Sequence, residues 1–82
     1  MKYTHKVDIW SLGIILYELA TGRTPFYAST IQQLQPKILH ETVKFPQGMS
    51  IYLRELIDGM LQKTPSKRYD WDQVKNHKFF IM

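Results

Sequence analysis

Hydrophobic residues between Val7 and Ala20 neither alternate nor keep to one side of a helix. The apolar positions that cover nearly every direction around a helical turn are Ile9, Trp10, Leu12, Ile14, Ile15, Leu16 and Leu19. The run is longer than a usual strand, which favours a helix. Asp8 would lie in its first turn, where the helix dipole favours a carboxylate, and Gly22 suits a left-handed cap just past its end. The pattern predicts a helix that is buried on all sides.

A helix that is apolar all round must be surrounded by protein or by lipid. No apolar run reaches the ~18 residues of a membrane span, so we expect no membrane contact and a shell made of protein. The rest of the chain could cover about half of such a helix. The remaining cover must come from a longer polypeptide or from an oligomer.

A second helix is expected from Thr30, whose hydroxyl and Gln33 form a capping box, through Leu39. Pro36 removes a backbone donor inside this segment, so we expect a kink or a break near Gln35. Residues 40–49 are expected to be a loop.

Two further helices follow this loop. Ser50 can cap one that runs to about Lys63, and Asp70 with Gln73 can cap a short one that turns Trp71 and Val74 inward. The apolar positions that define a single buried face of the third helix are Leu53, Leu56, Ile57, Met60 and Leu61. The predicted fold class is therefore all-α, with about four helices around one central buried helix.

Composition narrows the functional classes. The chain has 82 residues, 44% of them hydrophobic and 22% charged, which fits one small globular domain at most. It has no cysteine, which excludes disulfides, cysteine zinc sites and thiol catalysis and fits an intracellular, cytoplasmic protein. The net charge of +4 is spread along the chain, so nucleic-acid binding is disfavoured. His5, His40 and His77 are scattered and predict no metal site.

The order of residues is more specific than their composition. Residues 8–26, D-I-W-S-L-G-I-I-L-Y-E-L-A-T-G-R-T-P-F, resemble the buried central helix in the large lobe of eukaryotic protein kinases and the loop after it. K-I-L-H-E-T-V-K-F-P, L-Q-K-T-P-S-K-R and N-H-K-F-F follow in the family's order. The resemblance covers residues 1–82, fits the serine/threonine branch and is similar to Fused-type and Unc-51-like kinases. It implies the C-terminal helical part of an incomplete kinase domain.

The resemblance implies roles for residues of the first helix. Asp8 matches the aspartate whose carboxylate accepts hydrogen bonds from backbone amides of the catalytic loop and supports that loop. Without the motif, Asp8 is interpreted as an ordinary helix-terminal charge. Ile15 and Leu19 match positions that support the apolar column beneath the adenine, and by themselves are core residues. Glu18 matches a position that faces a substrate arginine in some kinases, against the alternative of a solvated acid next to Arg23.

The resemblance also implies a role for Arg68, which matches the arginine that pairs with the glutamate of an Ala-Pro-Glu motif. No such motif precedes Asp8 in this sequence. A buried arginine without its partner is unfavourable, so we expect Arg68 to turn to solvent in this chain. The sequence departs from the family pattern at Thr64, where an aspartate is usual, at Lys78, where a proline is usual, and at Pro36.

Phosphoryl transfer by a kinase needs a Gly-rich loop, a strand lysine, a catalytic-loop Asp and Asn, and an Asp-Phe-Gly metal ligand. None of these motifs occurs in the sequence, so we expect no catalytic residue, no bound cofactor and no activity from this chain alone. ATP and magnesium are implied only for the intact domain. The expected partners are the N-terminal part of a kinase domain and, in the intact enzyme, a protein substrate. The alternative hypotheses are a stand-alone all-α interaction module and, more weakly, a small nucleic-acid binder.

Overall fold

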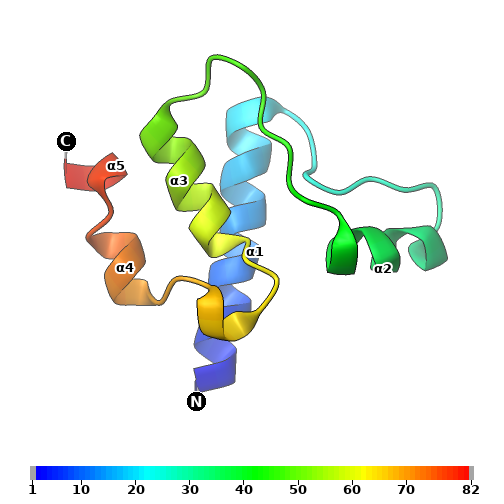
Figure 1. Cartoon of the computed structure of the whole chain (residues 1–82), viewed down its shortest axis with the longest axis horizontal. Helices are drawn as coiled ribbons and strands as arrows, with labels where there is room; N and C mark the ends of the chain where they lie inside the picture. The colour runs from blue at the N-terminus through cyan, green and yellow to red at the C-terminus, as the bar shows by residue number, and fades with distance from the viewer. Residues whose placement is uncertain (1, 82) are drawn as a thin grey trace.

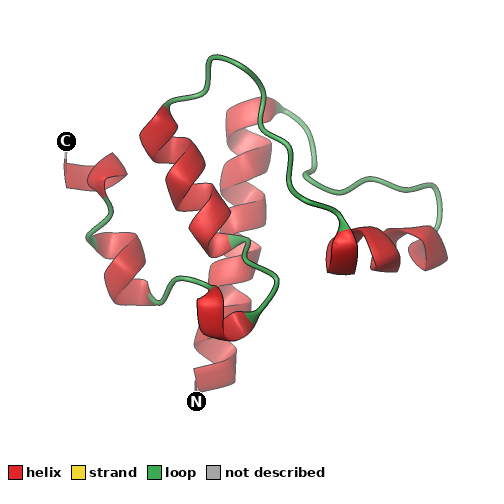
Figure 2. Cartoon of the chain, viewed as in Figure 1, coloured by secondary structure: helices red, strands yellow, loops and turns green. Residues whose placement is uncertain are grey.

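The computed structural model describes the backbone of residues 2–81 and the side chains of residues 5–80. Its elements are α1 (Lys2–Thr21), α2 (Ile31–His40), α3 (Ile51–Met60), the 3-10 turn η1 (Pro65–Lys67), α4 (Trp71–Lys75) and α5 (Lys78–Ile81). No strand occurs in this part of the chain (Figure 2). The all-α prediction is confirmed: the expected helices correspond to α1, α2, α3 and α4, while η1 and α5 add short turns that were not predicted.

The helices form a thin body rather than a closed bundle. α1 lies beside α3. In Figure 1, α4 and α5 lie on one side of α3, and α2 stands out on the opposite side of the molecule. The molecule measures 39 × 36 × 17 Å. Its thinnest dimension leaves room for about two packed helices. Helix α1 is therefore covered on one side only, as expected for a chain that is too short to enclose it.

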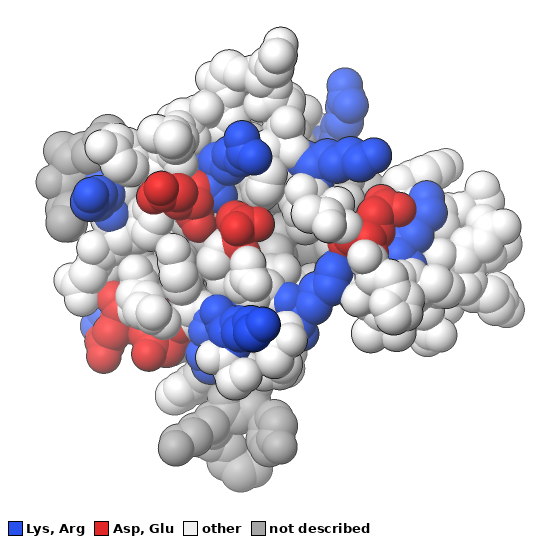
Figure 3. Space-filling view, in the orientation of Figure 1, with Lys and Arg blue, Asp and Glu red and all other residues white. Residues whose placement is uncertain are grey.

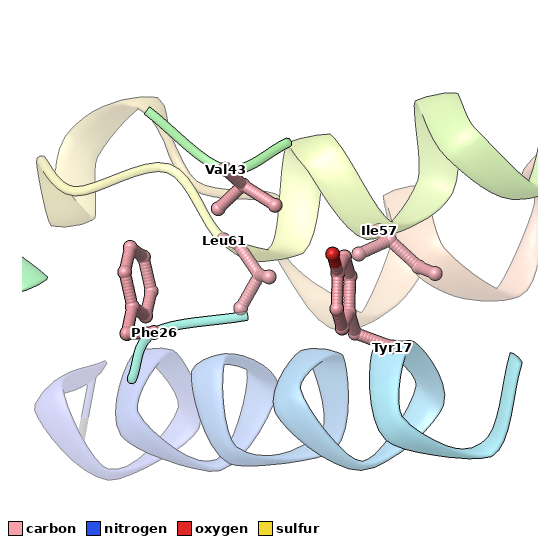
Figure 4. Close-up of a cluster of buried hydrophobic side chains, with 5 residues drawn as sticks. All are labelled: Tyr17, Phe26, Val43, Ile57 and Leu61. Atoms are coloured by element: carbon pink, nitrogen blue, oxygen red, sulfur yellow. The ribbon is translucent and has the colours of Figure 1, made fainter. Parts of the chain in front are cut away.

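The core is built around α3, which joins two clusters of buried side chains. Ile57 and Leu61 meet Tyr17 from α1 and two residues from the connecting segments, Phe26 and Val43 (Figure 4). On the neighbouring side of α3, a second set is made of Ile9, Leu56, Met60 and Val74. The single buried face predicted for this helix is confirmed, and it holds α1 and α4 in place.

Gly13 lets α1 and α3 approach closely. A Cβ atom at this position would lie 2.8 Å from Cδ2 of Leu61 and 3.0 Å from Cβ of Met60. Both distances are shorter than packed carbon atoms allow. The two helices can therefore pack this closely only because Gly13 has no side chain.

The three predicted N-cap residues are confirmed, although at Thr30 only the hydroxyl half of the predicted capping box with Gln33 forms. The Thr30 hydroxyl accepts a hydrogen bond from the backbone N–H of Gln33 at 3.2 Å, and the Ser50 hydroxyl accepts one from Leu53 at 3.4 Å. Asp70 and Gln73 form a full reciprocal capping box, with both distances 2.9 Å. These side chains bind backbone donors that the first helical turn cannot pair.

The ends of two helices differ from the prediction. α1 begins at Lys2, so Asp8 lies beyond the first turn and the expectation that it would occupy the first turn is wrong. α3 ends at Met60, with Leu61 as its C-cap, a few residues before the predicted end at Lys63; the carbonyls of Gln62 and Lys63 are bound by the side chain of Arg68. The left-handed residue expected after α1 is confirmed, since Gly22 has a φ of 74°.

Helix α2 is not broken at Gln35. It runs without interruption from Ile31 to His40, with Pro36 inside it. Proline removes the hydrogen bond that a backbone N–H at this position would make to the carbonyl of Gln32. Gln32 and Pro36 are both exposed, so water can satisfy that carbonyl. The expected break is absent because the Gln32 carbonyl, which loses its hydrogen-bond donor, faces solvent.

Candidate functional site

One face of α1 carries most of the residues to which the sequence assigned a role. We call this face the α1 stripe; its exposed members are Val7, Asp8, Ser11, Ile15, Glu18 and Leu19. In an α-helix, these positions fall within about 120° of arc. The opposite side of the helix packs on α3 through Ile9, Gly13 and Tyr17. The structure thus brings Asp8, Ile15, Glu18 and Leu19 to one surface.

The α1 stripe exposes more large apolar side chains than is usual for a helix face in contact with water. The exposed fractions of Val7, Ile15 and Leu19 are 58%, 49% and 79%. Large apolar side chains in a row mark an interaction surface more often than isolated ones do. Ile15 and Leu19, which residue patterns alone place in a core, lie outside the core of this chain.

The two acids of the α1 stripe are exposed. No hydrogen bond or ion pair among the side chains of residues 5–80 involves the carboxylate of Asp8 or of Glu18. Glu18 makes no ion pair with Arg23, so in this chain it is a solvated acid. An unpaired carboxylate beside apolar residues can accept hydrogen bonds from another polypeptide segment.

Arg68 is buried, so the expectation that it would turn to solvent is wrong. The residue is only 9% exposed. Nε donates to the carbonyl of Gln62 at 2.9 Å, Nη1 to that of Lys6 at 2.8 Å and Nη2 to that of Lys63 at 3.3 Å. The guanidinium carbon also lies 5.0 Å from the centre of the Trp10 ring. The charge is compensated by carbonyl dipoles and an aromatic face in place of a carboxylate.

The segment just past the end of α3 supplies two of these three acceptors, the carbonyls of Gln62 and Lys63. Carbonyls just past a helix C-terminus have no partner within the helix and carry partial negative charge, which suits a cation. Lys6 completes the arrangement, because its Nζ donates to the backbone carbonyl of Arg68 at 2.5 Å. Burial lowers the pKa of the Arg68 guanidinium from its usual value. Lys6 and Arg68 are thereby joined by two hydrogen bonds, in each of which the side chain of one residue donates to the backbone carbonyl of the other.

A groove of about 260 Å³ opens beside this arrangement. The residues that line it are Val7, Trp10, Ile38, Leu39, Lys63 and Arg68. Two of them are cations and none is an acid. Nζ of Lys63 donates to the carbonyl of Ile38 at 2.5 Å and lies 4.5 Å from the centre of the Phe26 ring. Burial lowers the pKa of Lys63, and the charge of Glu41 partly offsets this shift. The groove suits a ligand group with a negative charge and an apolar flank.

Sequence reasoning missed Lys6 and Lys63 and assigned Trp10 to packing alone. The signal that could have found the groove is the position of Lys63 at a predicted helix end, where cations are favoured. Nothing in the sequence shows that residue 6 meets residue 68, because this pairing depends on how α1 crosses α3.

Within residues 5–80, no group of three His, Asp or Glu side chains lies close enough together to hold a metal ion. His77 is paired with Glu55 at 3.8 Å, and Nδ1 of its ring accepts a hydrogen bond from the backbone of Phe79. No helix in the described part of the chain has the length and apolarity needed to cross a membrane.

Charges of both signs share the face of the molecule shown in Figure 3. On the face shown in Figure 3, lysines and arginines alternate with aspartates and glutamates. Nucleic-acid binders usually concentrate their cations on one face. The view gives no support to the nucleic-acid hypothesis.

Comparisons with known proteins show which family the chain belongs to. Residues 1–80 match the sequence model of a family described as the protein kinase domain. The chain is 42% identical over 77 residues to serine/threonine-protein kinase TIO of Arabidopsis thaliana, covering 94% of this chain and 6% of that protein. It is 43% identical over 77 residues to serine/threonine-protein kinase fused of Drosophila melanogaster, covering 94% and 10%.

A third relative is serine/threonine-protein kinase ULK4 of Mus musculus, 42% identical over 81 residues, which cover 89% of this chain and 6% of that protein. The chain therefore spans a small part of the length of the curated relatives that it matches.

Proposed function

Because the chain belongs to the protein kinase domain family, we propose that it forms the helical support of the large lobe of a serine/threonine kinase and is inactive by itself. The observation that carries this proposal is the α1 stripe on a helix that the family buries: its apolar side chains are exposed, and the carboxylate of Asp8 has no partner among the side chains of residues 5–80. The absence of the Gly-rich, Val-Ala-Ile-Lys, His-Arg-Asp and Asp-Phe-Gly motifs from the sequence supports inactivity of the isolated chain.

In the intact domain, Asp8 would hold the catalytic loop. Its carboxylate is exposed on the α1 stripe and free to accept several backbone N–H donors, which is a strong arrangement for an ionised acid. Ile15 and Leu19 would pack beneath the apolar column under the adenine. This packing would bury two residues that are now 49% and 79% exposed, which is favourable for apolar surface. Glu18, at the end of the same face, would be available to a basic residue of the protein substrate.

Arg68 and the groove beside it would take an acidic side chain from the segment that precedes α1 in the domain. The three carbonyl contacts already fix the guanidinium, so a carboxylate could bind it without further ordering of the arginine. ATP and magnesium would be held by other parts of the domain. The chain itself offers no three-ligand metal site among its described side chains, and no step of phosphoryl transfer is assigned to it.

Complementation of a split kinase domain tests this function. The chain would be mixed with the kinase-domain segment of the Drosophila fused kinase that precedes the region matched here. We expect no phosphotransfer from the chain alone and measurable phosphotransfer to a generic protein substrate from the mixture. Asp8→Ala should abolish the gain, while Ser11→Ala, a neighbour on the α1 stripe, should retain it.

Activity of the pure chain would contradict the proposal. A mixture that forms a complex and still fails to transfer phosphate would also count against a role in supporting the catalytic loop. A monomeric chain that melts sharply and binds neither the segment nor a hydrophobic dye would favour the alternative of a stand-alone interaction module.

A further inference from the structure

The chain contains two Thr-Pro dipeptides, Thr24-Pro25 and Thr64-Pro65, and the structure distinguishes them. Both threonines are exposed. The Thr24 hydroxyl donates to the carbonyl of Phe26 at 3.0 Å, which ties it to its own loop. Thr64 occupies the cap position of η1 without making a side-chain cap hydrogen bond. Of the two, Thr64 has the hydroxyl that is available for reaction.

The backbone around Thr64 is also accessible. Thr64 is extended, with φ −85° and ψ 119°. This is the conformation that a following proline imposes. Pro65, Ser66 and Lys67 are exposed as well and form a single 3-10 turn. Extending this turn opens three backbone hydrogen bonds: Lys67 and Arg68 donate to the Thr64 carbonyl at 2.9 and 3.1 Å, and Arg68 also donates to the Pro65 carbonyl at 3.2 Å.

Two lysines line the hollow beside Thr64. A hollow of about 240 Å³ is lined by Lys63, Thr64 and Lys67 together with one acid, Asp58. Lys67 follows Thr64 by three residues, whereas the residue at the same distance after Thr24 is Tyr27. A phosphate with nearly two negative charges at neutral pH would be stabilised by the two lysines and opposed by the aspartate.

We propose that Thr64 is a phosphorylation site for a proline-directed protein kinase acting on this chain. Oγ of Thr64 attacks the γ-phosphorus of ATP, the bond from that phosphorus to the β,γ-bridging oxygen breaks, and ADP leaves. The hydroxyl proton passes to the base of the modifying kinase. The product carries a phosphate between Lys63 and Lys67.

The modification would act on α2 through Lys63. In the unmodified chain its ammonium caps the last turn of α2 at the Ile38 carbonyl and lies over the Phe26 ring. Lys63 is partly buried here, and this burial lowers its pKa. A phosphate on the neighbouring residue offers a stronger and better solvated partner, so Lys63 would leave Ile38 and the end of α2 would loosen.

The test compares the two threonines in the same molecule. The full chain is treated with ATP and a proline-directed kinase that prefers a basic residue three positions after the acceptor, and phosphate is located by mass spectrometry over time. We expect Thr64 to react about tenfold faster than Thr24, from the combined effects of a free hydroxyl and a favourable charge. Lys67→Ala should slow Thr64 about fivefold and leave Thr24 unchanged.

Equal or faster modification of Thr24 would overturn the proposal, and so would an unmodified Thr64. Because both sites report on the unaltered chain, these outcomes do not depend on whether a variant folds.

The effect on α2 has its own measurement at the backbone N–H of Glu41. This group donates to the Lys37 carbonyl at 2.8 Å and closes the last turn of the helix. Its amide exchange should quicken about fivefold on phosphorylation, while the Lys63→Gln chain should show no further change. Exchange that stays constant in the phosphorylated chain would overturn the proposed coupling to α2.

Discussion

At the scale of single residues, Arg68 shows how a buried cation can be held without an acid. Removing a charge from water is costly unless its donors are paired, and the planar guanidinium directs donors along several fixed directions. Three carbonyls from two separate parts of the chain meet those directions, and the Trp10 ring covers one face. Arg68 therefore connects α1 to the end of α3 and also presents a charge to the adjoining groove.

Removing this side chain should destabilise the fold. Arg68→Ala loses three charge-assisted hydrogen bonds and is expected to lower the free energy of unfolding by about 2–4 kcal/mol. Arg68→Lys should recover less than half of this loss, because one ammonium cannot reach three diverging carbonyls. Urea unfolding measures both changes. Arg23→Ala, at an exposed position, is the control and should change stability by less than about 0.5 kcal/mol. Equal effects at both positions would show that the carbonyl contacts contribute little.

Tyr69 should make stability depend on alkaline pH. Burial, followed by the charges of Glu55 and Asp58, raises the pKa of this phenol above its usual value of 10.0. The folded state therefore keeps the proton longer than the unfolded state does. The resulting stabilisation is full below the unfolded pKa and is lost as pH rises through the folded pKa.

The measurement is the difference in free energy of unfolding between the native chain and Tyr69→Phe, from about pH 8 to about pH 11. The native chain should lose stability relative to Tyr69→Phe above about pH 10. Lys63, whose pKa is lowered, contributes the opposite slope in both chains, so it cancels in the difference. Tyr27→Phe, at a site 71% exposed, serves as the comparison. A constant difference for Tyr69→Phe would contradict the raised pKa.

At the scale of elements, the crossing of α1 and α3 depends on Gly13. In an isolated helix, alanine is favoured over glycine by about 1 kcal/mol. Here the added methyl group would meet Leu61 and Met60 at 2.8 and 3.0 Å. Gly13→Ala is therefore expected to lower stability by about 1–3 kcal/mol, which thermal unfolding can measure.

The control for this substitution lies on the exposed side of the same helix. Ser11→Ala should leave stability unchanged or raise it slightly, because alanine has the higher helix propensity and nothing packs on this position. A stabilised Gly13→Ala would show instead that the two helices can separate at little cost.

The elements differ in how far the sequence predicts them. Thr30, Ser50 and Asp70 act on donors a few residues away, so their caps follow from local order alone. The continuity of α2 through Pro36 could not be predicted, because it depends on a carbonyl that faces water in the fold. Arg68 illustrates the same limit more strongly. Its acceptors lie 62, 6 and 5 residues away, and only the packing of α1 on α3 brings them together.

At the scale of the whole molecule, the thin body leaves the α1 stripe in contact with water. A small chain without disulfides has little stability in reserve, and an exposed apolar face favours association. We expect the isolated chain to be helical, to unfold with low cooperativity and to bind a hydrophobic dye.

Replacing both Ile15 and Leu19 by Gln should reduce dye fluorescence and self-association, because both side chains are exposed. For the same reason, stability should change by less than about 0.5 kcal/mol. Fluorescence titration, analytical ultracentrifugation and urea unfolding measure the three quantities. Ile57→Ala, in the core, should instead lower stability by about 2–5 kcal/mol. Unchanged dye binding in the double variant would show that the exposed apolar surface that binds the dye lies outside the α1 stripe.

The link between Lys6 and Arg68 has a consequence for biosynthesis. The two residues are 62 positions apart in the chain. Translation adds roughly 5–20 residues per second, so about 3–12 seconds separate their emergence from the ribosome. For most of that interval the first helix has neither its partner arginine nor the third helix against it. We therefore expect its apolar face to bind chaperones that shield apolar helices while the later segments are being synthesised.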